Sequence, residues 1–280
     1  MNVSTLIKTA LKEDGAFNDI TSKSFIGQDK KAKAVLLAKK DGILCGTALF
    51  TAVFKALDKN CIVKFYKKDG DCVQKGVQVA KLRGNAQAVL SAERTALNFI
   101  GHLSGISTLT NHFVKLIAKG KPKIFDTRKT IPAYRALAKY AVVCGGGKNH
   151  RIGLSDMALI KDNHLKLISN LNEALALFRK KHKNILAEIE CENQKEVQAA
   201  LNAGADIIML DNMQISRAKK AIKLIRDFSS KNYKPEIEIS GGVNLDTIKK
   251  FAKLDIERIS VGMLTHSAQA LDLSLEITIE

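Results

Sequence analysis

The sequence lacks the features that place a chain in a membrane or send it out of the cell. No apolar run approaches the ~18 residues that are needed to span a bilayer. The first residues, MNVSTLIKTALKEDG, contain no long apolar stretch of the kind found in a signal peptide, and their apolar residues follow the spacing of one helix face. We therefore expect a soluble, cytoplasmic protein that begins with a helix.

Cysteines are few and show no pairing pattern. The five of them are scattered and odd in number, and no CxxC pair suggests zinc binding or redox exchange. We expect them to be reduced, as in the cytosol. The chain does not need disulfides for stability, because 280 residues with 46% hydrophobic content can bury the core of one α/β barrel or of two smaller domains.

Aromatic residues are also scarce, at 5%, whereas basic residues are in excess and give a net charge of +17. A basic chain suggests nucleic-acid binding, because lysine and arginine bind phosphate. The lysines are spread along the whole chain, however, and no RNP-like, zinc-finger or helix-turn-helix signature is present. The charge suits the steering of small anionic substrates equally well.

Three patterns follow one another along the chain. Residues 33–46 and 62–82 contain β-like segments separated by the turn signals Asp41-Gly42 and Asp69-Gly70, which predicts a small α/β domain. Residues 88–120 have helical periodicity interrupted near Gly101 and Gly105, so we expect two helices or one with a break. From residue 122, short apolar strands alternate with helical stretches, which indicates βαβ units and a parallel sheet.

In the later segments each apolar run comes first and a polar residue or glycine follows at its C-terminal end. These residues are Arg128 and Lys129, Lys161, Glu190, Asp211, Ser240 and Gly241, and Gly262. In an α/β barrel that end is the catalytic rim, and the loops after the last strands commonly hold phosphate. The pattern predicts a barrel enzyme that acts on a phosphorylated, multiply anionic substrate.

The same residues carry a resemblance to a known family. The segments ERTALNFIGHLSGIST, DTRKTIPAYRALAKYAVVCGGGKNHRIGLSDMALIKDNH, AEIE, IMLDN, ISGGV and VGMLTHS together resemble quinolinate phosphoribosyltransferase, also called nicotinate-nucleotide pyrophosphorylase (carboxylating). The match extends from LKEDGAFNDITS near the start to THS near the end. One departure is Asn18, where the family usually has glycine, and it lies outside the site motifs.

The resemblance implies a fold, an activity and an assembly. The fold is an N-terminal α/β sandwich-like domain, residues 1–105 with the C-terminal segment 265–280 packed on it. It is followed by an α/β barrel, TIM-like but incomplete and of the type II phosphoribosyltransferase kind, over residues 106–264. The activity joins quinolinate to phosphoribosyl pyrophosphate and gives nicotinate mononucleotide, pyrophosphate and CO₂, with Mg²⁺, in NAD biosynthesis. Members pair as homodimers or larger oligomers with shared active sites.

The resemblance also implies roles for individual residues. Arg94, Arg128 and Arg151, with His150 beside them, bind the two carboxylates of quinolinate, because arginine is a planar, bidentate donor. The three glycines of GGGKNHR, residues 145–151, let the loop bend and aim its basic residues inward. Glu190 and Asp211 bind the ribose hydroxyls and help to hold Mg²⁺, directly or through water.

The resemblance implies that further residues bind the phosphates and carboxylates of the substrates. Lys129 and Lys161 complete the catalytic set with Glu190 and Asp211. Further substrate contacts are expected from Thr127, Ser240, Gly241, Gly242, Val261, Gly262, Met263 and His266. The other histidines, His102, His112, His164 and His182, are read as packed or solvated.

Three alternatives remain open from the sequence. An aldolase-like barrel would use Lys161 as a Schiff-base nucleophile. A nucleic-acid binder would show a steep salt dependence and no need for the strand-end carboxylates. A related phosphoribosyltransferase, including the homologue associated with molybdenum transport, would use another acid, although the set of arginines favours a dicarboxylate.

Overall fold

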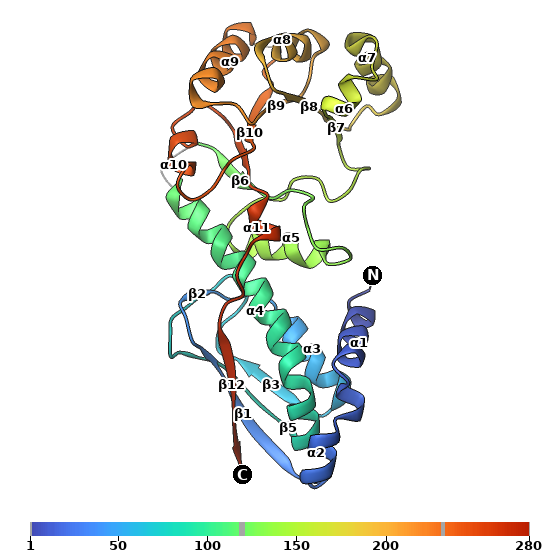
Figure 1. Cartoon of the computed structure of the whole chain (residues 1–280), viewed down its shortest axis with the longest axis vertical. Coiled ribbons are helices and arrows are strands. Elements are labelled where there is room, and N and C mark those ends of the chain that lie inside the picture. The colour runs from blue at the N-terminus through green and yellow to red at the C-terminus, as the bar shows by residue number, and fades with distance from the viewer. Residues whose placement is uncertain (1, 118–120, 231–232, 280) are drawn as a thin grey trace. The chain divides into compact units, whose positions relative to one another are not determined.

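The computed structural model describes residues 2–117, 121–230 and 233–279, and the chain divides into two compact units (Figure 1). The first unit contains Met1–Asn111, Ile131–Gly146 and Ser267–Glu280, and the second contains His112–Thr130 and Gly147–His266. Both mix helices and strands, which confirms the α/β class. The expected domain boundary between residues 105 and 106 stays a prediction.

Several helices belong to the first unit. They are α1 (Val3–Glu13), the 3₁₀ helix η1 (Ala16–Asn18), α2 (Ile20–Phe25), α3 (Thr47–Leu57), most of α4 (Ala86–Leu116) and α5 (Arg135–Cys144). The expected first helix is confirmed as α1. Its apolar spacing buries Ile7 and Leu11, and the side chain of Asn2 caps its N-terminus by accepting from Ser4 N at 2.9 Å.

The strands of the first unit form an antiparallel sheet in the order β12-β1-β5-β3. Their bounds are β1 (Lys31–Ala38), β3 (Ile62–Phe65), β5 (Gln78–Asn85) and β12 (Leu273–Ile279), and a separate two-stranded ladder joins β2 (Gly42–Ile43) to β4 (Cys72–Val73). Strand β12 places the end of the chain in this unit, since Glu276 lies opposite Val35 of β1. Phe50 of α3 packs on Phe65 of β3, with ring centroids 5.6 Å apart.

Helix α4 is continuous across Gly101 and Gly105, so the expected break is wrong. These glycines serve a close approach of the chain instead. A Cβ on Gly105 would lie 2.1 Å from the carbonyl oxygen of Gln269, and one on Gly101 would lie 3.1 Å from that of Leu271. Leu271 N donates to Gly101 O at 2.9 Å, which fastens this segment to the helix.

The second unit is a parallel sheet with helices between its strands, which confirms the expected βαβ pattern. The described residues form six strands in the order β6-β11-β10-β9-β8-β7. They are β6 (Lys123–Phe125), β7 (Ala158–Ile160), β8 (Ala187–Cys191), β9 (Ile207–Asp211), β10 (Glu236–Ser240) and β11 (Arg258–Ser260). The helices are α6 (Asp162–Leu165), α7 (Leu171–Lys181), α8 (Gln194–Ala203), α9 (Ile215–Phe228), α10 (Ile248–Phe251) and α11 (Met263–His266).

The connections of the second unit follow ordinary helix signals. Asn170 and Asn193 cap α7 and α8 by accepting from the main-chain N–H three residues later, and Gly204 ends α8 at φ +77°. Helices α7, α8 and α9 lie side by side along the strands β7 to β10 (Figure 1). Six strands are fewer than the eight of a complete TIM barrel, in agreement with the incomplete barrel that was expected.

None of the helices in the described residues combines the length and the apolar composition that a bilayer crossing requires.

Candidate active site

A cavity of ≈700 Å³ lies at the C-terminal ends of the parallel strands, and all its lining residues belong to the second unit. The site residues expected from the sequence that line it are Thr127, Arg128, Lys129, His150, Arg151, Lys161, Glu190, Asp211, Ser240, Gly241, Gly242, Gly262, Met263 and His266. Side chains from all six strand ends therefore meet in one space, as the rim of a barrel requires.

Two expected residues do not line this cavity. Val261 is buried and continues strand β11, with its N–H donating to Phe125 O at 2.9 Å. Arg94 is an exposed residue of α4 in the first unit. Its role in substrate binding stays a prediction.

Arg128 and Arg151 form the cationic part of the cavity. The Nε atom of Arg128 is buried and has no hydrogen-bond partner among the described residues. Burial lowers the pKa of Arg151, and the nearby charge of Arg128 lowers it further. Arg151 Nη1 donates to Met157 O at 3.2 Å, which fixes its side chain. Two neighbouring guanidinium groups, one with a free buried donor, indicate that a negatively charged ligand belongs here.

The triple glycine ends helix α5 and returns the chain to the sheet. Gly145 caps the helix, and a Cβ there would lie 2.4 Å from the carbonyl oxygen of Ser107. Gly146 takes the left-handed conformation at φ +90°. Lys148 then pairs in parallel with Phe125 at the end of β6, and the next two residues, Asn149 and His150, lead to Arg151. Only His150 and Arg151 of this basic segment line the cavity.

His150 is held against two buried carboxylates. Its Nε2 lies 3.0 Å from Glu188 Oε2 and 3.5 Å from Glu238 Oε1, and both glutamates are fully buried. Burial alone lowers the pKa of His150, but the hydrogen bonds and charges of the two glutamates outweigh it and raise the pKa to about 9. The charge of His150 is therefore compensated by the two glutamates with which it is paired. Its main-chain N donates to Asp126 Oδ1 at 2.8 Å, which fixes the backbone beside β6.

Glu188 and Glu238 were not predicted from the sequence as site residues, although the alternation of residues in their strands indicates their position. Strands AEIEC and EIEIS alternate glutamate with apolar residues, which places the glutamates of each strand on one face. Ser260 Oγ donates to Glu238 Oε1 at 2.5 Å, and burial together with the charge of Glu238 raises the pKa of Glu188. The ligand atoms of His150, Glu188 and Glu238 lie within 4.8 Å of one another, a geometry that a metal ion can also use.

Lys161 and Glu190 form an ion pair across the ends of β7 and β8. Lys161 Nζ donates to Glu190 Oε2, and the Lys161 side chain is 44% exposed whereas that of Glu190 is only 10% exposed. Because Lys161 Nζ donates to this carboxylate, it is poorly placed to attack a carbonyl group as a Schiff-base nucleophile. The pair instead presents one cation and one anion side by side to the cavity.

Asp211 ends strand β9 and is oriented by its neighbour Asn212, a further residue that the sequence analysis missed. Asn212 Nδ2 donates to Asp211 Oδ2 at 2.7 Å, and Asn212 N donates to Ser240 O at 3.0 Å. Asn212 takes a left-handed backbone at φ +52°, which asparagine tolerates better than most residues. A Cβ on Gly241 would lie 2.2 Å from Asn212 Oδ1, so only glycine fits beside it.

Two glycine-containing loops follow the last strands. Gly241 and Gly242 are left-handed, at φ +81° and +62°, and Gly262 precedes helix α11. Thr265 Oγ1 donates to Lys129 O at 2.7 Å, which joins α11 to the loop after β6. The other lining residues that the sequence analysis missed are Leu159, Met209, Val243, Asn244 and Ser260.

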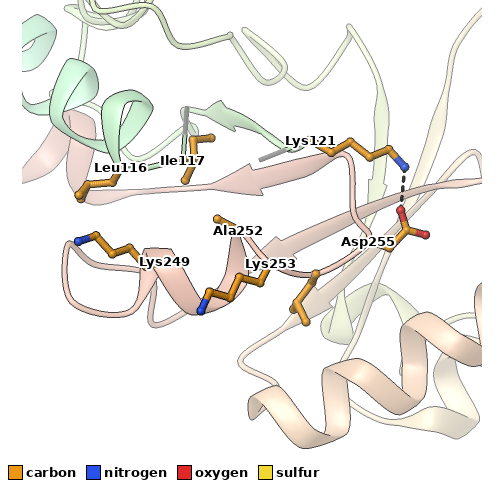
Figure 2. Close-up of a pocket in the computed structure, with 8 residues that line it drawn as sticks. Leu116, Ile117, Lys121, Lys249, Ala252, Lys253 and Asp255 are labelled. Carbon is orange, nitrogen blue, oxygen red and sulfur yellow. Dashed lines mark hydrogen bonds and ion pairs between the residues drawn. The ribbon is translucent and has the colours of Figure 1, made fainter. Parts of the chain in front are cut away.

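A second cavity of ≈620 Å³ lies at the other end of the strands, between the end of α4 and the segment around α10 (Figure 2). Its lining includes Leu116, Ala252 and Lys121, and Lys121 is paired with Asp255 at 2.9 Å. Its described lining has one acid, Asp255, beside three lysines, whereas the rim cavity brings carboxylates, lysines, arginines and histidines together. The rim cavity is therefore the candidate active site.

The fold and this cavity define an α/β-barrel enzyme that binds an anionic, phosphorylated substrate at its strand ends. Two family models match the chain and identify the kind of enzyme. The model of the quinolinate phosphoribosyl transferase C-terminal domain matches residues 106–276, and that of the N-terminal domain matches residues 19–104. The chain belongs to the quinolinate phosphoribosyltransferase family.

Individual relatives are similar to this chain over nearly its whole length. A probable nicotinate-nucleotide pyrophosphorylase (carboxylating) of Methanocaldococcus jannaschii is 41% identical, with 97% of this chain and 96% of the relative covered. A protein of the same description from Bacillus subtilis is 39% identical over 100% of this chain and 94% of its own. The crystal structure of NadC from Streptococcus pyogenes superposes with a TM-score of 0.92 at 38% identity, covering 99% of this chain and 97% of that one.

Proposed function

We propose that this chain transfers the phosphoribosyl group of phosphoribosyl pyrophosphate to quinolinate and decarboxylates the product. The products are nicotinate mononucleotide, pyrophosphate and CO₂, and the reaction belongs to NAD biosynthesis. The observation that carries the proposal is the pair Arg128 and Arg151, with its free buried donor, in the same cavity as Lys161, Glu190 and Asp211.

Quinolinate is a planar pyridine with two neighbouring carboxylates. Guanidinium groups match carboxylates with two parallel hydrogen bonds, which a lysine ammonium group does not do. We assign Arg128 and Arg151 to these carboxylates, with His150 beside them in the lining of the cavity. An acid with a single carboxylate leaves part of this charge without a partner, and this selects against it.

Phosphoribosyl pyrophosphate brings phosphates and a ribose. The loops at Gly241 and Gly242 and at Gly262 offer main-chain N–H groups at the strand ends where barrels hold phosphate. A Cβ on Gly262 would lie 3.3 Å from both Lys129 Cδ and His266 Nε2, so the glycine allows these two side chains to approach the same loop. We assign Lys129 and His266 to the phosphates.

Glu190 and Asp211 are assigned to the ribose hydroxyls and to Mg²⁺. Carboxylates are suitable ligands for Mg²⁺, which usually binds through one or two of them together with substrate phosphates and water. Glu190 is already engaged by Lys161, and one oxygen of Asp211 accepts from Asn212, so the fit is best when most of the ligands come from substrate and water. When bound, Mg²⁺ would neutralise charge that develops on the departing pyrophosphate.

The protein side chains contribute position and charge to the chemistry. Bound between the arginines and the ribose site, the quinolinate nitrogen is held close to C1 of the ribose, which acquires positive charge as pyrophosphate leaves. Lys129 and Lys161 stabilise the negative charge of the leaving group. Once the ring nitrogen is alkylated and positive, it stabilises the carbanion that remains when CO₂ departs, so no Schiff base with a lysine is required.

We also propose a homodimer or larger oligomer in the cytoplasm, in which Arg94 of one subunit acts on the site of another. Support comes from large apolar side chains that are exposed in both units. Ile20 and Phe25 of α2 are 79% and 83% exposed, and Leu154 and Leu167 of the second unit are 73% and 87% exposed. Burying these side chains against a second copy of the chain would remove them from water, which favours association.

The proposal is tested by comparing two acids. With phosphoribosyl pyrophosphate and Mg²⁺ present, quinolinate should be converted and nicotinate should not, because nicotinate lacks one of the two carboxylates. Arg128→Lys keeps the charge and loses the bidentate geometry, so it should raise KM for quinolinate by roughly 10-fold or more. Comparable turnover of both acids by the unaltered protein would contradict the assignment of quinolinate as the substrate.

A further inference from the structure

Cys45 and Cys144 lie side by side in the first unit although they are far apart in the sequence. Their Sγ atoms and a carboxylate oxygen of Asp69 all lie within 4.8 Å of one another. Both cysteines are free thiols. This proximity is the first requirement for a disulfide bond, whose sulfur atoms lie ~2.05 Å apart.

The surroundings hold this pair in place. Cys45 is fully buried just before α3, where its N–H donates to Ser104 Oγ at 2.9 Å. Asp69 is used for structure: Oδ1 accepts from the N–H groups of Gly46 and Thr47 at 3.0 Å, and Oδ2 accepts from Tyr140 OH at 2.9 Å. Both oxygens of the Asp69 carboxylate therefore have hydrogen-bond partners, and the two thiols are the reactive groups of the cluster.

The two thiols differ in exposure and in acidity. Cys144 is the last residue of α5 and is half-buried, whereas Cys45 is closed off from solvent. The Cys45 S–H group donates to the Cys144 sulfur, which lowers the pKa of Cys144 and raises that of Cys45. A partly exposed, more acidic thiol beside a second thiol is the usual arrangement of an attacking and a resolving cysteine.

The other cysteines lack this arrangement. Burial raises the pKa of Cys61 to about 11 and also raises the pKa of Cys191. Cys72 is exposed on β4 and belongs to no grouping of possible metal ligands found among the described residues. Only the Cys45 and Cys144 sulfurs are grouped in this way within the part of the chain that the structure describes.

We propose that Cys45 and Cys144 form a reversible disulfide site that reacts with low-molecular-weight disulfides such as oxidised glutathione. The Cys144 thiolate attacks one sulfur of oxidised glutathione, which breaks its S–S bond and releases one glutathione thiolate. Cys45 then loses its proton and attacks the Cys144 sulfur, and the second glutathione thiolate leaves as the Cys45–Cys144 bond forms. The two cysteines are oxidised, one oxidised glutathione is reduced to two thiols, and the two cysteine protons end on these thiols.

The bond ties the C-terminal end of α5 to the residue before the cap of α3. It closes a loop of about 100 residues, and a loop of that length gives a disulfide a large effect on the unfolded chain. The oxidised protein is therefore more resistant to heat than the reduced one. Cys144 directly precedes the glycine segment that leads to His150 and Arg151, so the bond also fixes the start of that segment.

The test uses the full-length protein and oxidised glutathione. After incubation and proteolysis without reductant, mass spectrometry should find a Cys45–Cys144 peptide pair that dithiothreitol separates. The melting temperature should rise by roughly 5–10 °C on oxidation and return on reduction. Cys72→Ser, which removes the exposed cysteine, should change neither result.

Cys144→Ser should abolish both the cross-linked peptide and the rise in melting temperature. The peptide map of the wild-type protein shows whether the disulfide forms even if a cysteine variant folds poorly. A stable glutathione adduct on Cys144 without a protein disulfide, a cross-link through Cys72, or recovery of both thiols unmodified would overturn the proposal. None of these readouts uses enzyme activity, so the result is independent of the proposed function.

Discussion

Single charged residues at the strand ends serve chemistry more than folding. The Lys161 side chain is 44% exposed, so its truncation removes little buried surface. Lys161→Ala and Glu190→Ala should therefore lower kcat by roughly 100-fold or more, because charge stabilisation in the transition state is lost, while the circular dichroism spectrum is unchanged.

Lys166 offers a matched control for that pair of variants. It forms an exposed ion pair with Asp162 at 3.2 Å and does not line the cavity. Lys166→Ala should keep its full turnover. A well-folded Lys161→Ala protein with nearly wild-type rates would count against the assigned site.

His150 gives a pH dependence whose sign is fixed by its surroundings. Its pKa rises from the ordinary 6.5 to about 9 in the folded protein, because Glu188 and Glu238 favour the charged ring. Its stabilising contribution is then complete below about pH 6.5 and is lost as the pH rises through about 9. Between pH 6 and pH 9.5, urea unfolding should show a loss on the order of 1–3 kcal/mol that His150→Asn does not show. An equal pH dependence in both proteins would contradict the paired His150.

Glycine in a sequence usually predicts an interruption of a helix. Helix α4 is an exception, because it continues through Gly101 and Gly105. Gly105→Ala would normally stabilise a helix, yet here the new Cβ meets the Gln269 carbonyl. We expect Gly105→Ala to lower the free energy of unfolding by roughly 1–3 kcal/mol in a denaturant titration. Gly27→Ala is the control, because nothing lies within 4 Å of a Cβ there and its effect should be small. A stabilised Gly105→Ala protein would refute the close approach.

The elements that the sequence predicted well are those with a local signal. Apolar runs followed by polar residues identified the strands of the barrel and most of the rim, because the carboxyl ends of parallel strands share one edge. The role of Gly105 could not be read in this way, since Gln269 comes from a distant part of the chain. Asn212 was missed for a similar reason: its contact with Gly241 depends on two strands lying side by side.

The proposed sharing of the active site between subunits can be tested by mixing two inactive proteins. Arg94→Ala and Lys161→Ala, refolded together in equal amounts, should form mixed dimers as about half of the total. If Arg94 acts in trans, each mixed dimer has one intact site of two, and roughly a quarter of wild-type activity returns. Activity that stays at the level of the separate mutants, in a sample shown to contain mixed dimers, would rule out the shared site.

The proposed reaction has three products, and the sharpest measurement quantifies all three in one sample. Quinolinate labelled in the carboxylate next to the ring nitrogen is incubated with phosphoribosyl pyrophosphate and Mg²⁺, and nicotinate mononucleotide, pyrophosphate and labelled CO₂ are quantified at several times. We expect all three to appear in equal amounts, and at rates lower by roughly 100-fold or more with Lys161→Ala, because the wild-type lysine lines the site. Pyrophosphate release without labelled CO₂, or a nucleotide that retains both carboxylates, would contradict it.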